Sequence, residues 1–147
     1  TDKSLPDYPV NYKIIDLNGD GKKELVYTFT ETINVMRHEL GRICTIQNGK
    51  VKQLWEDEDR YVTFFTLKGS KSKIVVEYQG SATQRFKVYR VVSDKLKEID
   101  SFHKRPFLDP DTQLVDYGYY RDTQEKWIKD PFGKYNQDLQ QIELKTL

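Results

Sequence analysis

The most informative stretch of the sequence is Asp16-Leu-Asn-Gly-Asp-Gly-Lys-Lys-Glu24, which is followed at once by Leu25-Val26-Tyr27. Oxygen-bearing side chains stand at alternate positions, and two glycines between them allow the backbone to turn tightly. A hard cation such as Ca²⁺ takes about six to eight oxygen ligands from one small volume. The candidate ligands are the side chains of Asp16, Asn18, Asp20 and Glu24 and the backbone carbonyl of Lys22. We therefore predict one Ca²⁺-type loop that leads directly into a strand.

Two other interpretations of this loop have to be weighed. Asp and Asn side chains accept hydrogen bonds from backbone amides two residues further on, so the same stretch also forms an ion-free Asx-type turn. An EF-hand loop begins with the same pattern, but it needs an acidic residue at its twelfth position and helices on both sides. The twelfth position is Tyr27, and strand-like sequence follows it. The EF-hand is disfavoured, while the calcium loop and the ion-free turn both remain open.

The sequence around the loop predicts short strands joined by turns. Strands are expected at 11–17 and 24–32. Asn48-Gly49 between the β-rich runs 42–47 and 50–56 is the strongest hairpin signal, because a type I′ turn needs positive φ at both central residues. No segment shows a sustained helical apolar period, so the predicted fold class is all-β.

Other segments are less uniform. Strands are also predicted at 61–67, 73–79, 84–92, 95–102, 113–120 and 138–144, with 84–92 and 95–102 forming a second hairpin. Residues 104–111 contain two prolines and are expected to be a connection, and the acidic run 56–59 is expected to be a solvated loop. Residues 33–40 fit either a strand end or one helical turn, and 121–135 show no clear pattern.

Similar segments recur along the chain and suggest an internal repeat. Lys50-Val-Lys-Gln-Leu54, Lys95-Leu-Lys-Glu-Ile99 and Asp138-Leu-Gln-Gln-Ile142 share apolar second and fifth positions. We therefore predict a single domain, 1–147, built from three approximate units. The units are 11–56, 61–102 and 107–144. In the second unit Thr66, Lys68, Ser70 and Ile74 occupy the positions of the predicted ligands, so that unit is expected to bind no cation.

The loop and the repeat together resemble the calcium-loop repeat of the FG-GAP/VCBS type, found in integrin α-subunit propellers and in many secreted bacterial proteins. In that family the ligands fall at the first, third, fifth, seventh and ninth loop positions, which correspond here to Asp16, Asn18, Asp20, Lys22 and Glu24. The resemblance implies an antiparallel meander of about three propeller-blade-like repeats. A closed propeller has about four to eight blades, so a β-sandwich or a barrel with a short helical piece is the alternative.

A group of aromatic residues is the candidate ligand-binding surface. Tyr117, Tyr119 and Tyr120 lie together, and Trp127 follows shortly after them. Planar rings with a polar tip recognise sugars or proteins, but they also fill cores. On strict alternation, Tyr117 and Tyr119 share one face of a strand and Tyr120 takes the other.

The composition excludes several classes of function. The 24 basic and 23 acidic residues leave a net charge of +1, which gives no electrostatic footprint for nucleic acid. A single cysteine, Cys44, permits no internal disulfide and is expected to be buried. No apolar run reaches the roughly 18 residues of a membrane span. No catalytic motif occurs, and no catalytic residue is predicted.

These observations predict a non-enzymatic, extracytoplasmic binding or scaffold domain in which one Ca²⁺ loop stabilises the fold. Its expected location is extracellular or in a bacterial cell envelope, with the targeting segment already removed. Its expected partner is a protein or a glycan. The alternative is a carbohydrate-active enzyme or an accessory carbohydrate-binding module. Two carboxylates about 5–10 Å apart in an aromatic groove would favour the enzyme.

Overall fold

The computed structural model describes most of the chain. The described residues are 10–59, 61–70, 72–79, 84–92, 95–133 and 137–147, with the side chains of 33, 57–59 and 61 excepted. Strands dominate, and the only helical piece in these ranges is the short 3-10 helix η1 (Asp122–Gln124). The predicted all-β class is confirmed.

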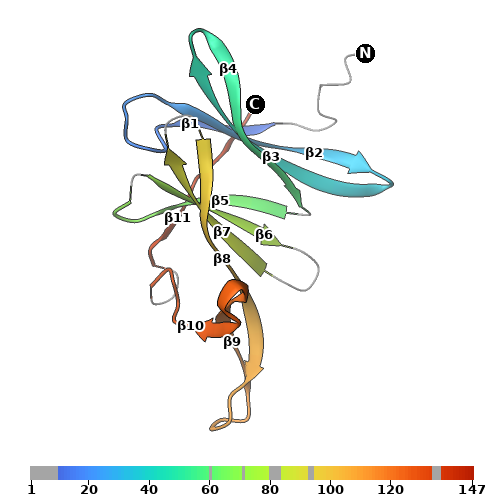
Figure 1. Ribbon diagram of the computed structural model, residues 1–147. Helices are drawn as coiled ribbons and strands as arrows, with labels where there is room; N and C mark the ends of the chain where they lie inside the picture. Colours follow the sequence, from blue (N-terminus) through green and yellow to red (C-terminus); the bar gives the residue numbers. More distant parts are fainter. Residues whose placement is uncertain (1–9, 60, 71, 80–83, 93–94, 134–136) are drawn as a thin grey trace.

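The strands form two antiparallel sheets, neither of which closes into a barrel (Figure 1). The five-stranded sheet has the order β12-β1-β2-β3-β4, with β1 (Asn11–Ile15), β2 (Glu24–Ile33), β3 (Met36–Gln47), β4 (Lys50–Asp59) and β12 (Lys145–Thr146). The seven-stranded sheet has the order β10-β9-β8-β7-β6-β5-β11, with β5 (Tyr61–Leu67), β6 (Lys73–Gln79), β7 (Gln84–Val92), β8 (Lys95–Leu108), β9 (Val115–Arg121), β10 (Lys126–Ile128) and β11 (Leu139–Gln141).

The two sheets fit the sandwich alternative, and the described strands do not show propeller blades. The first predicted unit supplies β1–β4 and the second supplies most of β5–β8. The described strands of the third unit form no sheet of their own, because β9 and β10 extend one edge of the seven-stranded sheet and β11 pairs with β5 at the other edge. The three-unit repeat therefore stays a prediction.

Local turn chemistry accounts for the hairpins. Asn48 and Gly49 have φ of 51° and 74° between the paired ends of β3 and β4, as predicted. In the ambiguous segment 33–40, Asn34 and Val35 form a second turn of this kind, with φ of 51° and 60°, and β3 begins directly after it at Met36. The β7–β8 strands also pair as predicted, with their turn residues 93–94 outside the described part.

Two predicted loops are strands instead. β4 continues through the acidic run to Asp59, which is tolerated because β4 is an edge strand and charges on an edge discourage unwanted pairing. β8 continues through Pro106 to Leu108. Pro106 stands opposite Tyr117, whose N–H donates to the Asp116 carboxylate at 2.8 Å and not across the pair. The missing N–H of Pro106 therefore faces the outer edge, where it costs no ladder bond.

Beyond Lys104, β8 has no described partner except β9. This two-stranded hairpin, residues 105–118, projects from the sheet at the bottom of Figure 1 and is called the arm from here on.

The hydrophobic core has two parts, one on each face of the seven-stranded sheet. β6 shows why, since Ile74 and Val76 belong to one cluster and Val75 to the other, as strand alternation requires. The first cluster joins the two sheets and includes Val26, Ile43, Phe64 and, from the 16–24 loop, Leu17. The second cluster contains Phe86, Phe102 and Tyr119 under Phe132. Cys44 is a buried free thiol, as predicted.

Candidate functional site

The predicted calcium loop connects β1 to β2, and its centre is the Asp16 carboxylate. Asp16 Oδ1 accepts hydrogen bonds from Gly19 N at 2.8 Å and Asn18 N at 3.3 Å, and Oδ2 accepts one from Gly21 N at 2.9 Å. The Gly21 amide is the main cause of a lowered pKa at Asp16, supported by the Gly19 and Asn18 amides against a smaller effect of burial. Gly19 and Gly21 have φ of 75° and 85°, which explains why glycine stands at both positions.

The other alternate side chains cap the turn in the same way. Asn18 Oδ1 accepts from Asp20 N at 3.2 Å, and Asp20 Oδ1 accepts from Lys22 N at 2.8 Å. The Asn18 side-chain amide donates to Asp20 Oδ2 at 3.2 Å. Each residue thus satisfies a backbone amide two positions further on, which is the Asx-turn arrangement.

Glu24 ties this exposed loop to the core. Its side chain is only 3% exposed, and its Oε2 accepts a hydrogen bond from Leu17 N at 2.8 Å. Burial raises the pKa of Glu24, and the negative charges of Asp20 and Asp16 raise it further, against the lowering effect of the Leu17 amide. Leu17 itself lies in the cluster between the sheets, so its buried side chain holds the loop against the core.

In the structure the loop is an Asx-type turn, in which side-chain oxygens accept hydrogen bonds from the loop's own backbone amides. In the part of the chain that the structure describes, no group of three or more His, Cys, Asp or Glu side chains is placed to hold a metal ion. The donor types nevertheless fit Ca²⁺, because a carboxylate oxygen that accepts one N–H still has a second lone pair. The ligand set Asp16, Asn18, Asp20, Lys22 and Glu24 therefore stays a prediction.

A cleft of about 580 Å³ lies beside this loop, between the two sheets. Its lining residues are Asp16, Leu17, Gly19 and Gly21 on one side and Thr66, Leu67, Gly69, Ser70 and Gln140 on the other. The β5–β6 turn, aligned above with the loop as its ligand-free counterpart, thus lies across the cleft from it.

The structure separates the four predicted aromatic residues. Tyr119 is buried in the second core cluster, where its ring packs against Phe86, Phe102 and Phe132, and it is not available to a ligand. Tyr120 stands directly opposite Trp127, with ring centroids 5.5 Å apart. Tyr117 is 61% exposed and Trp127 is 48% exposed.

Tyr117 and Trp127 line a recess of about 470 Å³ on the arm, together with Phe107, Gly118 and Ile128. Gly118 lets two of these rings pack directly onto the strand, since a Cβ there would lie 3.2 Å from the Trp127 ring and 3.3 Å from Phe107. Sequence reasoning missed Phe107, which fell in the supposed connection. Gly118 carried a signal, because a glycine within a strand marks close approach of other groups.

Arg105 adds a positive charge beside the recess. Its guanidinium carbon lies 4.7 Å from the Tyr120 ring centroid and 5.9 Å from that of Trp127. None of the ion pairs of the described residues includes Arg105. On the same face of the sheet, His103 Nδ1 lies 2.8 Å from Asp122 Oδ2.

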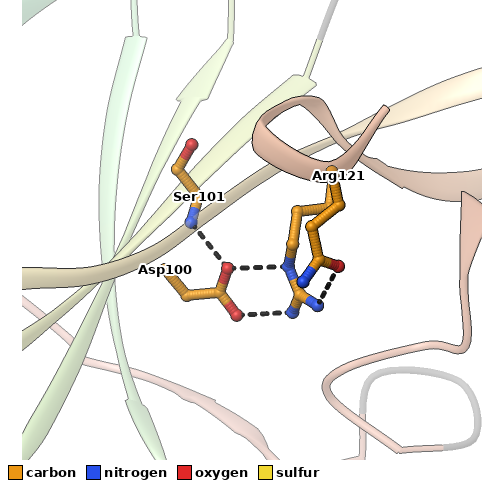
Figure 2. Close-up of polar contacts among 4 residues, drawn as sticks. Asp100, Ser101 and Arg121 are labelled. Atoms are coloured by element: carbon orange, nitrogen blue, oxygen red, sulfur yellow. Dashed lines mark hydrogen bonds and ion pairs between the residues drawn. The ribbon is translucent and has the colours of Figure 1, made fainter. Parts of the chain in front are cut away.

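An ion pair between Arg121 and Asp100 links β9 to β8, as Figure 2 shows. Arg121 Nε and Nη2 donate to the two oxygens of Asp100 at 3.0 and 2.6 Å. Ser101 N also donates to Asp100 at 2.9 Å, and Arg121 Nη1 donates to Gln124 in η1 at 3.3 Å. This fork joins the end of β9 to β8 and supports the turn from which β10 and Trp127 follow.

Comparisons of the chain with protein-family models, with curated proteins and with solved structures found no match. Among the described residues, no helix is long and apolar enough to cross a membrane.

Proposed function

We propose that this protein is a non-enzymatic, extracytoplasmic binding or scaffold domain that takes its ligand at the aromatic recess of the arm. The observation that carries this proposal is the half-exposed ring of Trp127 in a recess that Tyr117 also lines, from the other face of β9. Pockets of this kind bury a ligand against aromatic walls. The residues that line the recess include no carboxylate, histidine or cysteine, which supports binding over hydrolysis.

The edges of the arm support recognition through side chains. An open strand edge normally invites another strand to add to it. Here Pro106 lacks an N–H at one edge, and the Tyr117 N–H at the other edge is already bonded to Asp116. Strand addition is therefore disfavoured at this level of the arm, while the rings remain accessible.

We further propose that the 16–24 loop binds one Ca²⁺ ion, which stabilises the fold. Glu24 supports this proposal, because its buried carboxylate lies close enough to Asp16 and Asp20 for their charges to raise its pKa. A divalent cation would remove that repulsion. Extracellular modules bind Ca²⁺ with dissociation constants of about 10⁻⁴–10⁻³ M, which suits an exposed loop outside the cytoplasm.

The calcium proposal is tested by thermal unfolding in Ca²⁺ and in chelator. At about a hundredfold excess over the dissociation constant, Ca²⁺ should stabilise the parent by about 2.7 kcal/mol, and Asp16→Ala should lose this gain. Asp109→Ala is the matched control, since Asp109 Oδ1 caps the amide of Asp111 at 2.8 Å in another turn. It should keep the full response to Ca²⁺. A parent whose melting temperature is the same in both solutions would contradict the proposal.

The recess is tested by screening the parent and Trp127→Ala against glycan and peptide arrays. Leu114→Ala is the control, because Leu114 is an exposed apolar residue of the arm that does not line the recess. We expect ligands that bind the parent and Leu114→Ala but not Trp127→Ala. If every ligand of the parent also binds Trp127→Ala equally well, the recess is not the binding site.

A further inference from the structure

From the recess and its neighbouring charge, we infer that the ligand is an anionic carbohydrate. Its sugar ring stacks on Trp127, and its carboxylate, sulfate or phosphate group pairs with Arg105. This inference rests on the proposed function, because it names the ligand class of the same recess.

The indole ring of Trp127 is held ready for stacking. Phe107 and Tyr120 pack against it edge-to-face, each with ring centroids 5.5 Å away, and the ring lies directly over Gly118, where a Cβ would come within 3.2 Å of it. A ring fixed in this way loses little freedom when a ligand binds. The flat C–H face of a sugar matches such a ring. The recess of about 470 Å³ falls within the range of about 300–1,000 Å³ for small-ligand sites.

The charge beside the recess distinguishes an anionic sugar from a neutral one. The guanidinium of Arg105 is fixed by the rings of Tyr120 and Trp127, and its planar fork suits a carboxylate or phosphate group. Two acids also lie nearby: Asp116 accepts a hydrogen bond from the Tyr117 amide, and Asp122 lies beside His103.

A protein ligand fits the same features less well. Stable protein interfaces bury about 800 Å² on each partner, far more than a recess lined by five residues offers. A protein ligand that adds a strand is also disfavoured at the level of Pro106 and Tyr117, where one edge lacks an N–H and the N–H at the other edge is bonded to Asp116.

The test is calorimetric titration with two sets of probes. The first contains uronic-acid and sulfated oligosaccharides, each beside a neutral oligosaccharide of matching linkage, and the second contains a poly-glutamate peptide. The variants are Arg105→Gln, with Arg90→Gln as an exposed-arginine control on β7, and Gly118→Ala, whose methyl group would push the Trp127 and Phe107 rings out of place. Melting temperatures are recorded for each variant, so that loss of folding is recognised.

We expect at least one acidic sugar to bind the parent more tightly than its neutral counterpart, and added salt to reduce the difference. Arg105→Gln should weaken the acidic sugar about tenfold and leave the neutral one unchanged. Gly118→Ala should weaken both about tenfold, and Arg90→Gln should change neither.

Three results are informative in different ways. If no acidic sugar outbinds its neutral partner, the inference fails, while a neutral sugar whose binding depends on Gly118 keeps the proposed function. If only the peptide binds and needs both Arg105 and Gly118, the ligand is an acidic protein and the carbohydrate inference fails. If Gly118→Ala, while still folded, changes the binding of no probe, the inference and the proposed recess fail together.

Discussion

At the scale of single residues, Glu24 shows two opposing effects. Its hydrogen bond from Leu17 N holds the loop to the core, while burial and the charges of Asp20 and Asp16 make its ionised form costly. Asp16 is the opposite case, because amides of its own turn favour its ionised form. The loop therefore stabilises the ionised form of Asp16 and destabilises that of Glu24, and a bound cation would reduce the repulsion at Glu24.

Replacing Glu24 by glutamine separates these effects. The glutamine side chain keeps an oxygen for the Leu17 amide but carries no charge, so Glu24→Gln should be more stable than the parent in chelator and should lose the stabilisation by Ca²⁺. Thermal unfolding of both proteins in both solutions measures this. A variant that is less stable than the parent in chelator would show that the buried charge does not destabilise the fold.

The pH dependence of the calcium-free protein follows from the same residue. Folding raises the pKa of Glu24 above its usual 4.5. At pH values between 4.5 and the raised pKa, the folded protein therefore retains a proton that the unfolded chain has lost. The parent should therefore lose stability relative to Glu24→Gln as pH rises from 4.5 through the raised pKa. The lowered pKa of Asp16 acts in a separate window below 3.8, where stability falls as the pH drops. Denaturant unfolding of the two proteins in chelator, from about pH 3 to about pH 8, checks both directions; a pH-independent difference between them would be the contrary result.

At the scale of elements, the two tight turns of the five-stranded sheet use the same backbone with different residues. Asn48-Gly49 is the preferred sequence for positive φ at both positions, whereas Asn34-Val35 puts a β-branched residue at φ 60°. Val35 is 97% exposed, so no burial compensates for this conformation. The β2–β3 turn was consequently ambiguous in the sequence, while the β3–β4 turn was clear.

Val35→Gly should stabilise the protein by about 1 kcal/mol, because the left-handed conformation costs a non-glycine residue about 1–2 kcal/mol. The reciprocal change, Gly49→Val, should destabilise it by a similar amount, since Gly49 has φ 74° with open space around it. Chemical denaturation of the two variants measures both shifts. Stability unchanged or lowered in Val35→Gly would mean that the β2–β3 turn is not strained.

At the scale of the whole molecule, the last residues join the two sheets and cover the outer face of one of them. β11 pairs with β5, and β12 pairs with β1. Between β10 and β11, Phe132 packs on Phe86 and Phe102 with ring centroids 5.1 Å away in each case. The segment after β10 therefore buries Tyr119 under Phe132, while the Trp127 ring stays half exposed.

Phe132→Ala and Trp127→Ala should differ sharply in stability. Phe132 is 1% exposed, and its truncation should cost about 3–5 kcal/mol and increase the binding of a hydrophobic dye to the exposed face of the sheet. Trp127→Ala should cost clearly less, because that ring is half exposed. Equal losses in the two variants would indicate that Trp127 is a structural residue and would count against the recess as a binding site.

The sequence by itself determined the β class, the hairpins at Asn48-Gly49 and between β7 and β8, and the tight turn at 16–24. These features depend on local backbone preferences and on alternation within one strand, which neighbouring residues specify. It also placed Trp127 and Tyr117 in the candidate site. It did not separate them from Tyr119, because burial depends on which side of a strand meets another layer.

Only the tertiary structure decided the rest. Phe132 covers Tyr119 from a segment outside the strand, and Gly118 is needed because the Trp127 and Phe107 rings approach it from two other strands. Pro106 suggested a connection, yet it lies in a strand, because an arm with open edges requires no N–H there. Contacts between residues far apart in sequence set these outcomes, and local preference contains no information about them.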